Sequence, residues 1–244
     1  MNNNALLNNF IIQSSGGIID PVPISKEGLL FYLDANKYSG EGNWVDLTDN
    51  GYNFIPINNP SYVSGGNSYF TFTGENVDGP MFTHSLAETT TLDNWSFYVW
   101  LYHQEGADSN YQSIFDKDED EELFYLYSTT TPEPAMWSPI VYSDQIIETE
   151  TWYNICCTYQ RNAPGPGDGE CRFYINGEPV EANPIEHTDN SSPADSWHIG
   201  GGYDGDETNE LFCGRMAAAA LYDIELSDET VFNNYEADKA RFGF

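Results

Sequence analysis

Basic residues are scarce in this chain. Its 244 residues include 8 Lys and Arg against 39 Asp and Glu, which gives a formal net charge of −31 at pH 7. A surface this negative repels phosphate backbones and anionic lipid headgroups, so we expect no nucleic-acid partner. Most of the acids are expected to form a solvated surface. Long apolar runs are also missing, and no stretch approaches the ~20 residues that cross a bilayer, so no membrane insertion is expected.

Catalytic and zinc-binding motifs are missing as well. The 4 cysteines show no Cys-x-x-Cys spacing, and no Gly-x-Ser-x-Gly is present to complete a hydrolase triad. The histidines are scattered along the chain, at His84, His103, His187 and His198. The N-terminal segment has neither the basic start nor the apolar core of a signal peptide, so export by the standard route is not expected.

The cysteines are expected to be free thiols. Cys156 and Cys157 are adjacent, so in a strand they point to opposite faces. Pairing of either with Cys171 across a hairpin is the alternative. Buried free thiols are favoured in a large domain without an export signal.

Short segments rich in aromatic and β-branched residues dominate the rest of the sequence. Residues 95–102, 151–159 and 171–180 have this composition, and the last contains Asn176-Gly177, a strong hairpin signal. Further strands are predicted at 29–33, 53–57, 69–73, 112–115, 123–127, 197–200 and 216–222. The pattern predicts an all-β fold of two packed antiparallel sheets. The strand aromatics expected in its core are Trp95, Trp100, Trp152 and Tyr174.

One helix is predicted, near the C-terminus. Ser227 can cap it, and the acids that follow complement the positive end of the helix dipole. The residues expected on its buried face are Val231, Phe232 and Tyr235.

The sequence divides into an N-terminal arm, residues 1–27, and one domain, residues 28–244. The arm is Asn-rich and then rich in Ser, Gly and Pro, so it cannot bury enough apolar surface to fold alone. It either stays mobile or orders against a partner, as an anchoring segment for assembly. The residues expected to dock are Phe10, Ile11, Ile12, Ile18 and Ile19.

Two acidic segments are the candidates for a catalytic site. A glycoside hydrolase needs two carboxylates about 5–10 Å apart across a cleft. Residues 116–122 and 204–207 supply acids, but both segments look like turns between strands. The sequence therefore disfavours hydrolysis.

The second acidic segment also suggests calcium. Hard cations bind several carboxylate and carbonyl oxygens of flexible loops. The candidate ligands, which follow the turn at residues 200–202, are Asp204, Asp206, Glu207 and Asn209. An exposed acidic loop is the alternative. The run that begins at Asp116 resembles an EF-hand loop, but Glu121 occupies its glycine position, so that interpretation fails.

Exposed aromatic rings would serve glycan binding. The chain has 17 Tyr, 6 Trp and 14 Phe, and the candidates in predicted loops are Trp137, Tyr111 and Tyr203. Tyrosine and tryptophan suit this task because they combine an apolar face with a polar group. Trp137 has an alternative role, which is to hold the shape of a proline-rich loop.

The order of these motifs resembles the concanavalin A-like, laminin G-like jelly-roll superfamily. The resemblance covers residues 28–244 and implies a two-sheet jelly-roll sandwich. It rests on segments of the printed sequence at 33–35 (LDA), 44–47 (WVDL), 70–74 (FTFTG), 95–100 (WSFYVW), 152–155 (WYNI), 173–177 (FYING), 199–201 (IGG) and 214–216 (GRM).

The two ends of the domain are similar to laminin G-like domains in structural proteins of tailed bacteriophages. The similar segments are 28–35 (GLLFYLDA), 226–229 (LSDE), 234–237 (NYEA) and 241–243 (RFG). This resemblance implies a non-enzymatic virion protein, such as a capsid decoration protein, head fibre or tail-fibre module, assembled in the host cytoplasm. The arm would bind major capsid or tail proteins, the sandwich would contact host glycans, and a homo-oligomer, a trimer or higher, is expected. The alternatives are a free-standing lectin and a glycoside hydrolase.

Overall fold

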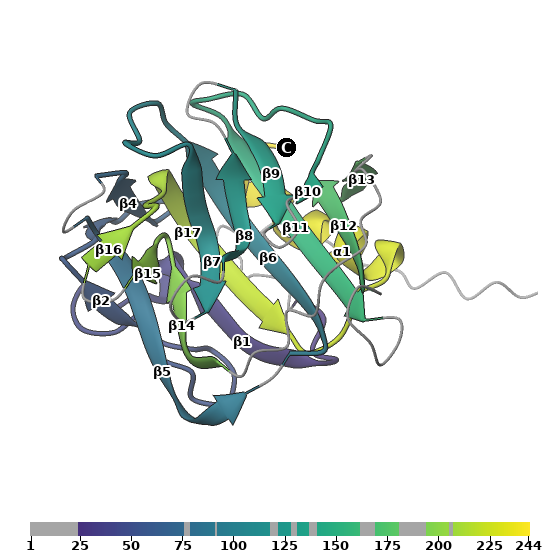
Figure 1. Ribbon diagram of the computed structural model, residues 1–244, viewed down its shortest axis with the longest axis horizontal. Coiled ribbons are helices and arrows are strands. Elements are labelled where there is room, and N and C mark those ends of the chain that lie inside the picture. Colours follow the sequence, from purple (N-terminus) through teal and green to yellow (C-terminus); the bar gives the residue numbers. More distant parts are fainter. Residues whose placement is uncertain are drawn as a thin grey trace, which may run out of the picture.

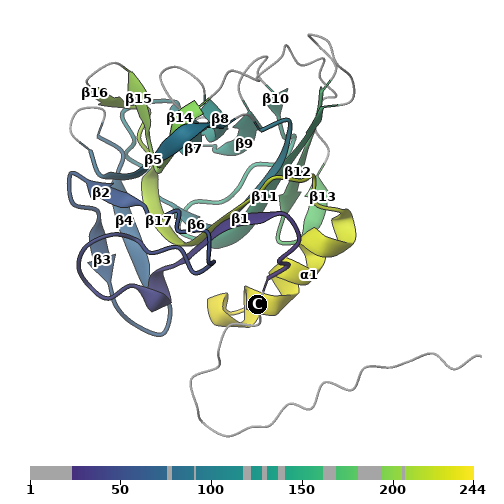
Figure 2. The ribbon, with the colours of Figure 1, turned by 90° about the horizontal axis from the view of Figure 1, so that it is seen from below.

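Two antiparallel sheets packed face to face form the body of the protein (Figure 1). The computed structural model describes residues 24–75, 79–90, 92–117, 122–127, 131–136, 141–161, 169–180, 194–204 and 207–244. Seen from below, the two sheets lie one above the other, and the C-terminal helix lies outside the lower one (Figure 2). The predicted all-β sandwich with a C-terminal helix is confirmed.

The first sheet has eight strands. Their order is β13 (Glu178–Val180), β12 (Gly169–Ile175), β11 (Trp152–Arg161), β6 (Asn94–His103), β17 (Cys213–Tyr222), β4 (Tyr69–Thr73) and β3 (Ser61–Val63), with β1 (Leu29–Asp34) beside the second half of β17. A 3-10 helix, η1 (Ala35–Lys37), follows β1. Since neighbours such as β6 and β17 are far apart in sequence, the sheet is held by long-range pairing.

The second sheet has seven strands. Their order is β10 (Val141–Tyr142), β9 (Glu133–Met136), β8 (Glu122–Tyr127), β7 (Tyr111–Lys117), β14 (Ala194–Ile199), β5 (Met81–Thr90) and β2 (Ile55–Ile57). A separate hairpin, β15 (Gly202–Asp204) and β16 (Glu207–Asn209), follows β14.

Aromatic side chains fill the space between the sheets. Phe97 of the eight-stranded sheet stacks on Phe115 of the seven-stranded sheet, with ring centroids 4.5 Å apart and planes 12° apart. Trp95 belongs to this buried core, as predicted. Burial of such rings supplies most of the free energy that favours folding.

A second apolar layer lies on the outer face of the eight-stranded sheet. Trp100 and Tyr174 are fully buried there, beneath the C-terminal helix. Phe242 stacks on Trp100 with centroids 3.9 Å apart. Trp152 differs from the prediction, because it lies at the margin of this layer and is only half-buried.

The helix α1 (Asp228–Asp238) begins as predicted. The Ser227 side chain accepts a hydrogen bond from the Thr230 backbone N–H at 3.2 Å. The residues of its buried face are Val231, Asn234, Tyr235 and Asp238. The expectation for Phe232 is wrong, because that side chain is 39% exposed and lies off this face. In the described part of the chain, no helix is long and apolar enough to cross a membrane.

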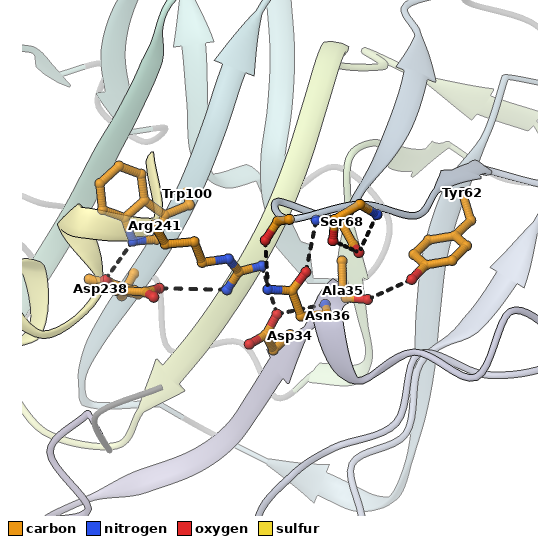
Figure 3. A network of polar contacts seen from close by, with 11 residues as sticks. Asp34, Ala35, Asn36, Tyr62, Ser68, Trp100, Asp238 and Arg241 are labelled. Carbon is orange, nitrogen blue, oxygen red and sulfur yellow. Dashed lines mark hydrogen bonds and ion pairs between the residues drawn. The ribbon is translucent and has the colours of Figure 1, made fainter. Parts of the chain in front are cut away.

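A buried charge cluster ties the chain end to β1 and is completed by the 3-10 helix η2 (Lys239–Phe242) that follows α1 (Figure 3). The Arg241 guanidinium lies 2.8 Å from an Asp34 oxygen and 3.9 Å from an Asp238 oxygen. The same Asp34 oxygen accepts the Asn36 backbone N–H at 2.8 Å. All three charged side chains are almost fully buried.

All four cysteines are free thiols, as expected. Cys156 and Cys157 face opposite sides of β11, and Cys157 lies inside the sandwich with its Sγ atom 3.4 Å from that of Cys171. Burial raises the pKa of the Cys157 thiol well above its ordinary value.

The last residues of the predicted arm contact the domain. Ile24 is buried against the outer apolar layer, and the Ser25 backbone N–H donates to the Asn234 side-chain oxygen at 2.8 Å. The five predicted docking residues between Phe10 and Ile19 lie outside the described residues. The anchoring role of the arm and its boundary at residue 27 stay predictions.

Candidate functional site on the outer face of the seven-stranded sheet

Three tyrosines gather on the outer face of the seven-stranded sheet. The pairing of β7 with β8 sets Tyr111 opposite Tyr127 and places Tyr125 two positions along. The Tyr111 ring centroid lies 5.7 Å from that of Tyr125 and 5.4 Å from that of Tyr127. Side chains alternate along a strand, so Tyr125, between the core residues Phe124 and Leu126, faces away from the core.

Exposure differs within this tyrosine cluster, which we define as Tyr111, Tyr125 and Tyr127. Tyr125 is fully buried, whereas Tyr111 and Tyr127 are half-buried. Tyr125 therefore supports the cluster from within, and the other two rings offer the accessible surface. Paired tyrosine rings give an apolar face with hydroxyl groups at its edge, the combination that saccharide rings require.

Polar side chains continue the same face. Register sets His198 of β14 opposite Asp116 of β7 on one side and Thr83 of β5 on the other. The His198 Nε2 atom lies 3.2 Å from the Ser196 hydroxyl oxygen. Asp116 and His198 are buried, with exposures of 2% and 4%. These polar side chains are therefore covered, and the half-buried tyrosines provide the accessible surface near them on this face.

Asp116 lies in a strand, which differs from the turn that the sequence predicts. Instead of lying in a turn, Asp116 belongs to β7, and β8 begins at Glu122, which is its cross-strand partner. The expectation that these acids lie in a turn is therefore wrong, because Asp116 and Glu122 occupy paired positions on neighbouring strands. The Glu122 side chain lies outside what the structure describes.

Glu133 adds an acid near the same face, since it pairs with Tyr127 across β8 and β9. Burial raises the pKa of the Glu133 carboxyl, and the charge of Asp144 raises it further. Glu133 therefore loses its proton at a higher pH than a solvated glutamate does.

Among the described histidines, His103 has a clearly lowered pKa, but its contacts serve the structure of the sandwich. Burial lowers its pKa to about 4, so the ring is neutral at pH 7. Its Nε2 atom lies 3.1 Å from the Gln112 side-chain nitrogen, and the Gln112 oxygen accepts the Cys213 backbone N–H at 3.1 Å. This arrangement joins β7 to β17 and presents no activated nucleophile.

The structure brings together only part of the predicted sites. Of the predicted glycan-binding residues, Tyr111 lies in the tyrosine cluster, Trp137 lies outside the described residues, and Tyr203 is described only by its backbone in β15. Of the calcium candidates, Asp206 lies outside the described residues, and the side chains of Asp204, Glu207 and Asn209 are not described. No group of three potential metal ligands occurs among the side chains that are described. The calcium site stays a prediction.

Sequence reasoning missed Tyr125 and Tyr127 as partners of Tyr111. The alternation Phe124-Tyr125-Leu126-Tyr127 places both tyrosines on one face, which was a usable signal. Their pairing with Tyr111 depends on strand register, which the sequence does not reveal.

The comparison with family models decides the family. Residues 64–232 match a laminin G-type model described as the concanavalin A-like lectin/glucanases superfamily. The chain belongs to this superfamily. A comparison with curated proteins gives no match.

Solved structures share the superfamily fold with this chain. The receptor-binding domain of botulinum neurotoxin type G is 14% identical with a TM-score of 0.59, over 86% of this chain and 51% of that one. The binding domain of serotype D, in complex with N-acetylneuraminic acid, is 16% identical with a TM-score of 0.57, over 86% and 50%. This chain thus spans about half the length of those domains.

Another structure matches over its whole length. Domain 4 of AbnA, an extracellular arabinanase of Geobacillus stearothermophilus, in complex with arabinotriose, is 14% identical with a TM-score of 0.59, over 86% of this chain and 100% of that one. At these identities, the likeness shows a shared fold.

Proposed function

We propose that this protein is a non-enzymatic, lectin-like domain that binds glycans on the tyrosine cluster of the seven-stranded sheet. The observation that carries the proposal is the contact of half-buried Tyr111 and Tyr127 with buried Tyr125 on the outer face of the sheet. Superfamily membership and the saccharides in the matched serotype D and arabinanase structures support it.

A glycan array followed by titration calorimetry tests this function. We expect binding of the wild type, and a loss of about tenfold in affinity for each of Tyr111→Ala and Tyr127→Ala, because each removes one stacking ring. Tyr38→Ala, a half-buried tyrosine packed against Tyr62 and Phe70, is the matched control. Wild-type affinity in both cluster variants would contradict the proposed site.

A hydrolysis assay tests the non-enzymatic part of the proposal. The bound glycan, incubated with the protein, should release no new reducing ends. Turnover that disappears in Asp116→Asn would instead make the Asp116 and Glu122 pair a glycosidase site.

The bacteriophage virion role stays a prediction based on sequence resemblance, and the comparisons favour the lectin-like alternative over it. Ile24 and Ser25 contact the domain, so a truncation that tests the arm should end before Ile24. Deletion of residues 1–23 should abolish incorporation into particles and leave the melting temperature nearly unchanged. Undiminished incorporation of the truncated chain would rule out the anchoring arm.

A further inference from the structure

Arg215 lies on the opposite side of the molecule from the tyrosine cluster, on the outer face of the eight-stranded sheet. Strand β17 sets Arg215 opposite Tyr102 of β6 and Thr71 of β4. The guanidinium carbon lies 4.4 Å from the Tyr102 ring centroid and 4.9 Å from that of Tyr69. Two tyrosine rings thus hold one cation by cation–π contacts.

The polar contacts of Arg215 differ from those of the other arginines. In the described part of the chain, Arg215 forms no ion pair and no hydrogen bond. The other arginines each contact a carboxylate at 2.8 Å, namely Arg161 with Asp93, Arg172 with Glu170, and Arg241 with Asp34. Within the described residues, the N–H donors of Arg215 therefore have no acceptor and can bind one from a ligand.

A half-buried tryptophan extends the site. Trp152 is the cross-strand partner of Tyr102, and its ring centroid lies 5.6 Å from that of Tyr102 and 6.0 Å from that of Tyr69. Phe242 of the C-terminal segment packs against Trp152, with ring centroids 5.0 Å apart. All four side chains of the group are half-buried, so they are supported by the sheet and still reach solvent.

The chemistry of this group selects one ligand class. A planar guanidinium can donate two parallel hydrogen bonds to a carboxylate. An indole ring can pack against the apolar face of a sugar ring. A hexuronate carries both features within one residue. The chain's net charge of −31 repels anions at long range, so only an anion with matching short-range contacts gains from this site.

We propose that Arg215, Tyr69, Tyr102 and Trp152 form a second saccharide site, which binds an acidic polysaccharide through a hexuronate residue. The carboxylate pairs with Arg215, and the sugar ring packs on Trp152. This site uses no residue of the tyrosine cluster, so it stands or falls separately from the function proposed above.

Titration calorimetry with oligogalacturonate and oligoalginate, in the presence of EDTA to exclude calcium bridges, tests the site. The wild type should bind at least one of the two acids, and Arg215→Gln should weaken that binding by at least about tenfold. The fully methyl-esterified oligogalacturonate lacks the carboxylate. Its affinity for the wild type should therefore be no higher than the affinity of the acid for Arg215→Gln. Arg172→Gln removes the same charge from an arginine that is already paired, and should bind as the wild type does.

A second measurement covers the case in which Arg215→Gln does not fold. In the wild type, the Trp152 indole N–H resonance, assigned with Trp152→Phe, should shift with the acidic oligosaccharide and stay fixed with the ester. Failure of both acids to bind, equal binding of acid and ester, or an unmoved Trp152 signal would overturn the proposal. Tyr111→Ala should leave oligouronate affinity unchanged, which separates this site from the tyrosine cluster.

Discussion

At the scale of single residues, the burial of Asp238 makes stability depend on pH. Burial raises the pKa of Asp238 to about 6, the charge of Asp34 adds to this, and Arg241 offsets part of it. Because the folded protein then holds this proton more tightly than the unfolded chain, the stability contribution falls as pH rises from about 4 to 6, by up to about 3 kcal/mol. The wild type should melt at a higher temperature at pH 5 than at pH 7.5.

The variant Asp238→Asn isolates this group, because asparagine mimics the protonated acid. Its melting temperature should change less between pH 5 and pH 7.5 than that of the wild type. Asp49→Asn, at an exposed position, removes the same formal charge without the buried contact and should keep the wild-type difference. A pH difference as large in Asp238→Asn as in the wild type would assign the effect to other groups.

At the scale of elements, the turn between β12 and β13 is a tight hairpin turn that packs against Tyr235 of α1. Asn176 and Gly177 have φ values of 53° and 80°, as a two-residue hairpin requires. A Cβ atom on Gly177 would lie 2.9 Å from the Tyr235 Cδ1 atom of α1. Gly177→Ala should therefore lower the free energy of unfolding by about 2–4 kcal/mol, from backbone strain plus displacement of the helix.

Chemical denaturation of a matched variant separates the two causes. Gly51 has a similar φ of 82°, but a Cβ atom there would meet nothing within 4 Å. Gly51→Ala should cost only the strain of about 1–2 kcal/mol. Equal losses in the two variants would show that the contact with Tyr235 contributes nothing.

The elements that the sequence predicts are those with a strong local pattern. The strand over residues 69–73 and the start of the helix at Ser227 follow from alternation and capping chemistry, which act over a few residues. Strand β5 (Met81–Thr90) was missed, because its mixture of polar and apolar residues alternates poorly. Strands β9 and β10 are too short for a periodic signal.

The candidate sites were harder to predict, because they depend on pairing between distant segments. Tyr111 was named as an aromatic residue of a predicted loop, but it lies in strand β7, and its contact with Tyr125 and Tyr127 follows from register. Arg215 lies in a strand whose neighbours are mostly buried, so nothing local indicates that its own side chain reaches solvent. Its pairing with Tyr102 is set by strands more than a hundred residues apart in sequence.

At the scale of the whole molecule, the net charge of −31 sets the response to salt. Like charges over the surface repel one another and destabilise the compact state, and salt screens this repulsion. Raising NaCl from 10 to 300 mM should increase the melting temperature by roughly 3–6 °C, or about 1–2 kcal/mol. A melting temperature that falls with salt would mean that attractive ion pairs outweigh the repulsion.

The same melting series tests the predicted calcium site. At matched ionic strength, CaCl₂ should raise the melting temperature above the NaCl value, and the double variant Asp204→Asn, Asp206→Asn should abolish the excess. Magnesium is the control cation. An identical curve in calcium and sodium salts would remove calcium as a ligand of these residues.

The position of the C-terminal segment determines how the protein should be immobilised for such measurements. The Phe244 ring centroid lies 6.0 Å from that of Trp100, and Phe242 packs on Trp152. A tether fused after Phe244 would therefore begin on the same face of the molecule as Arg215. A sensor chip loaded through that tether presents Tyr111 and Tyr127 to the flowing analyte and crowds Trp152 against the chip matrix. Coupling chemistry therefore decides which of the two saccharide sites an immobilised assay can detect.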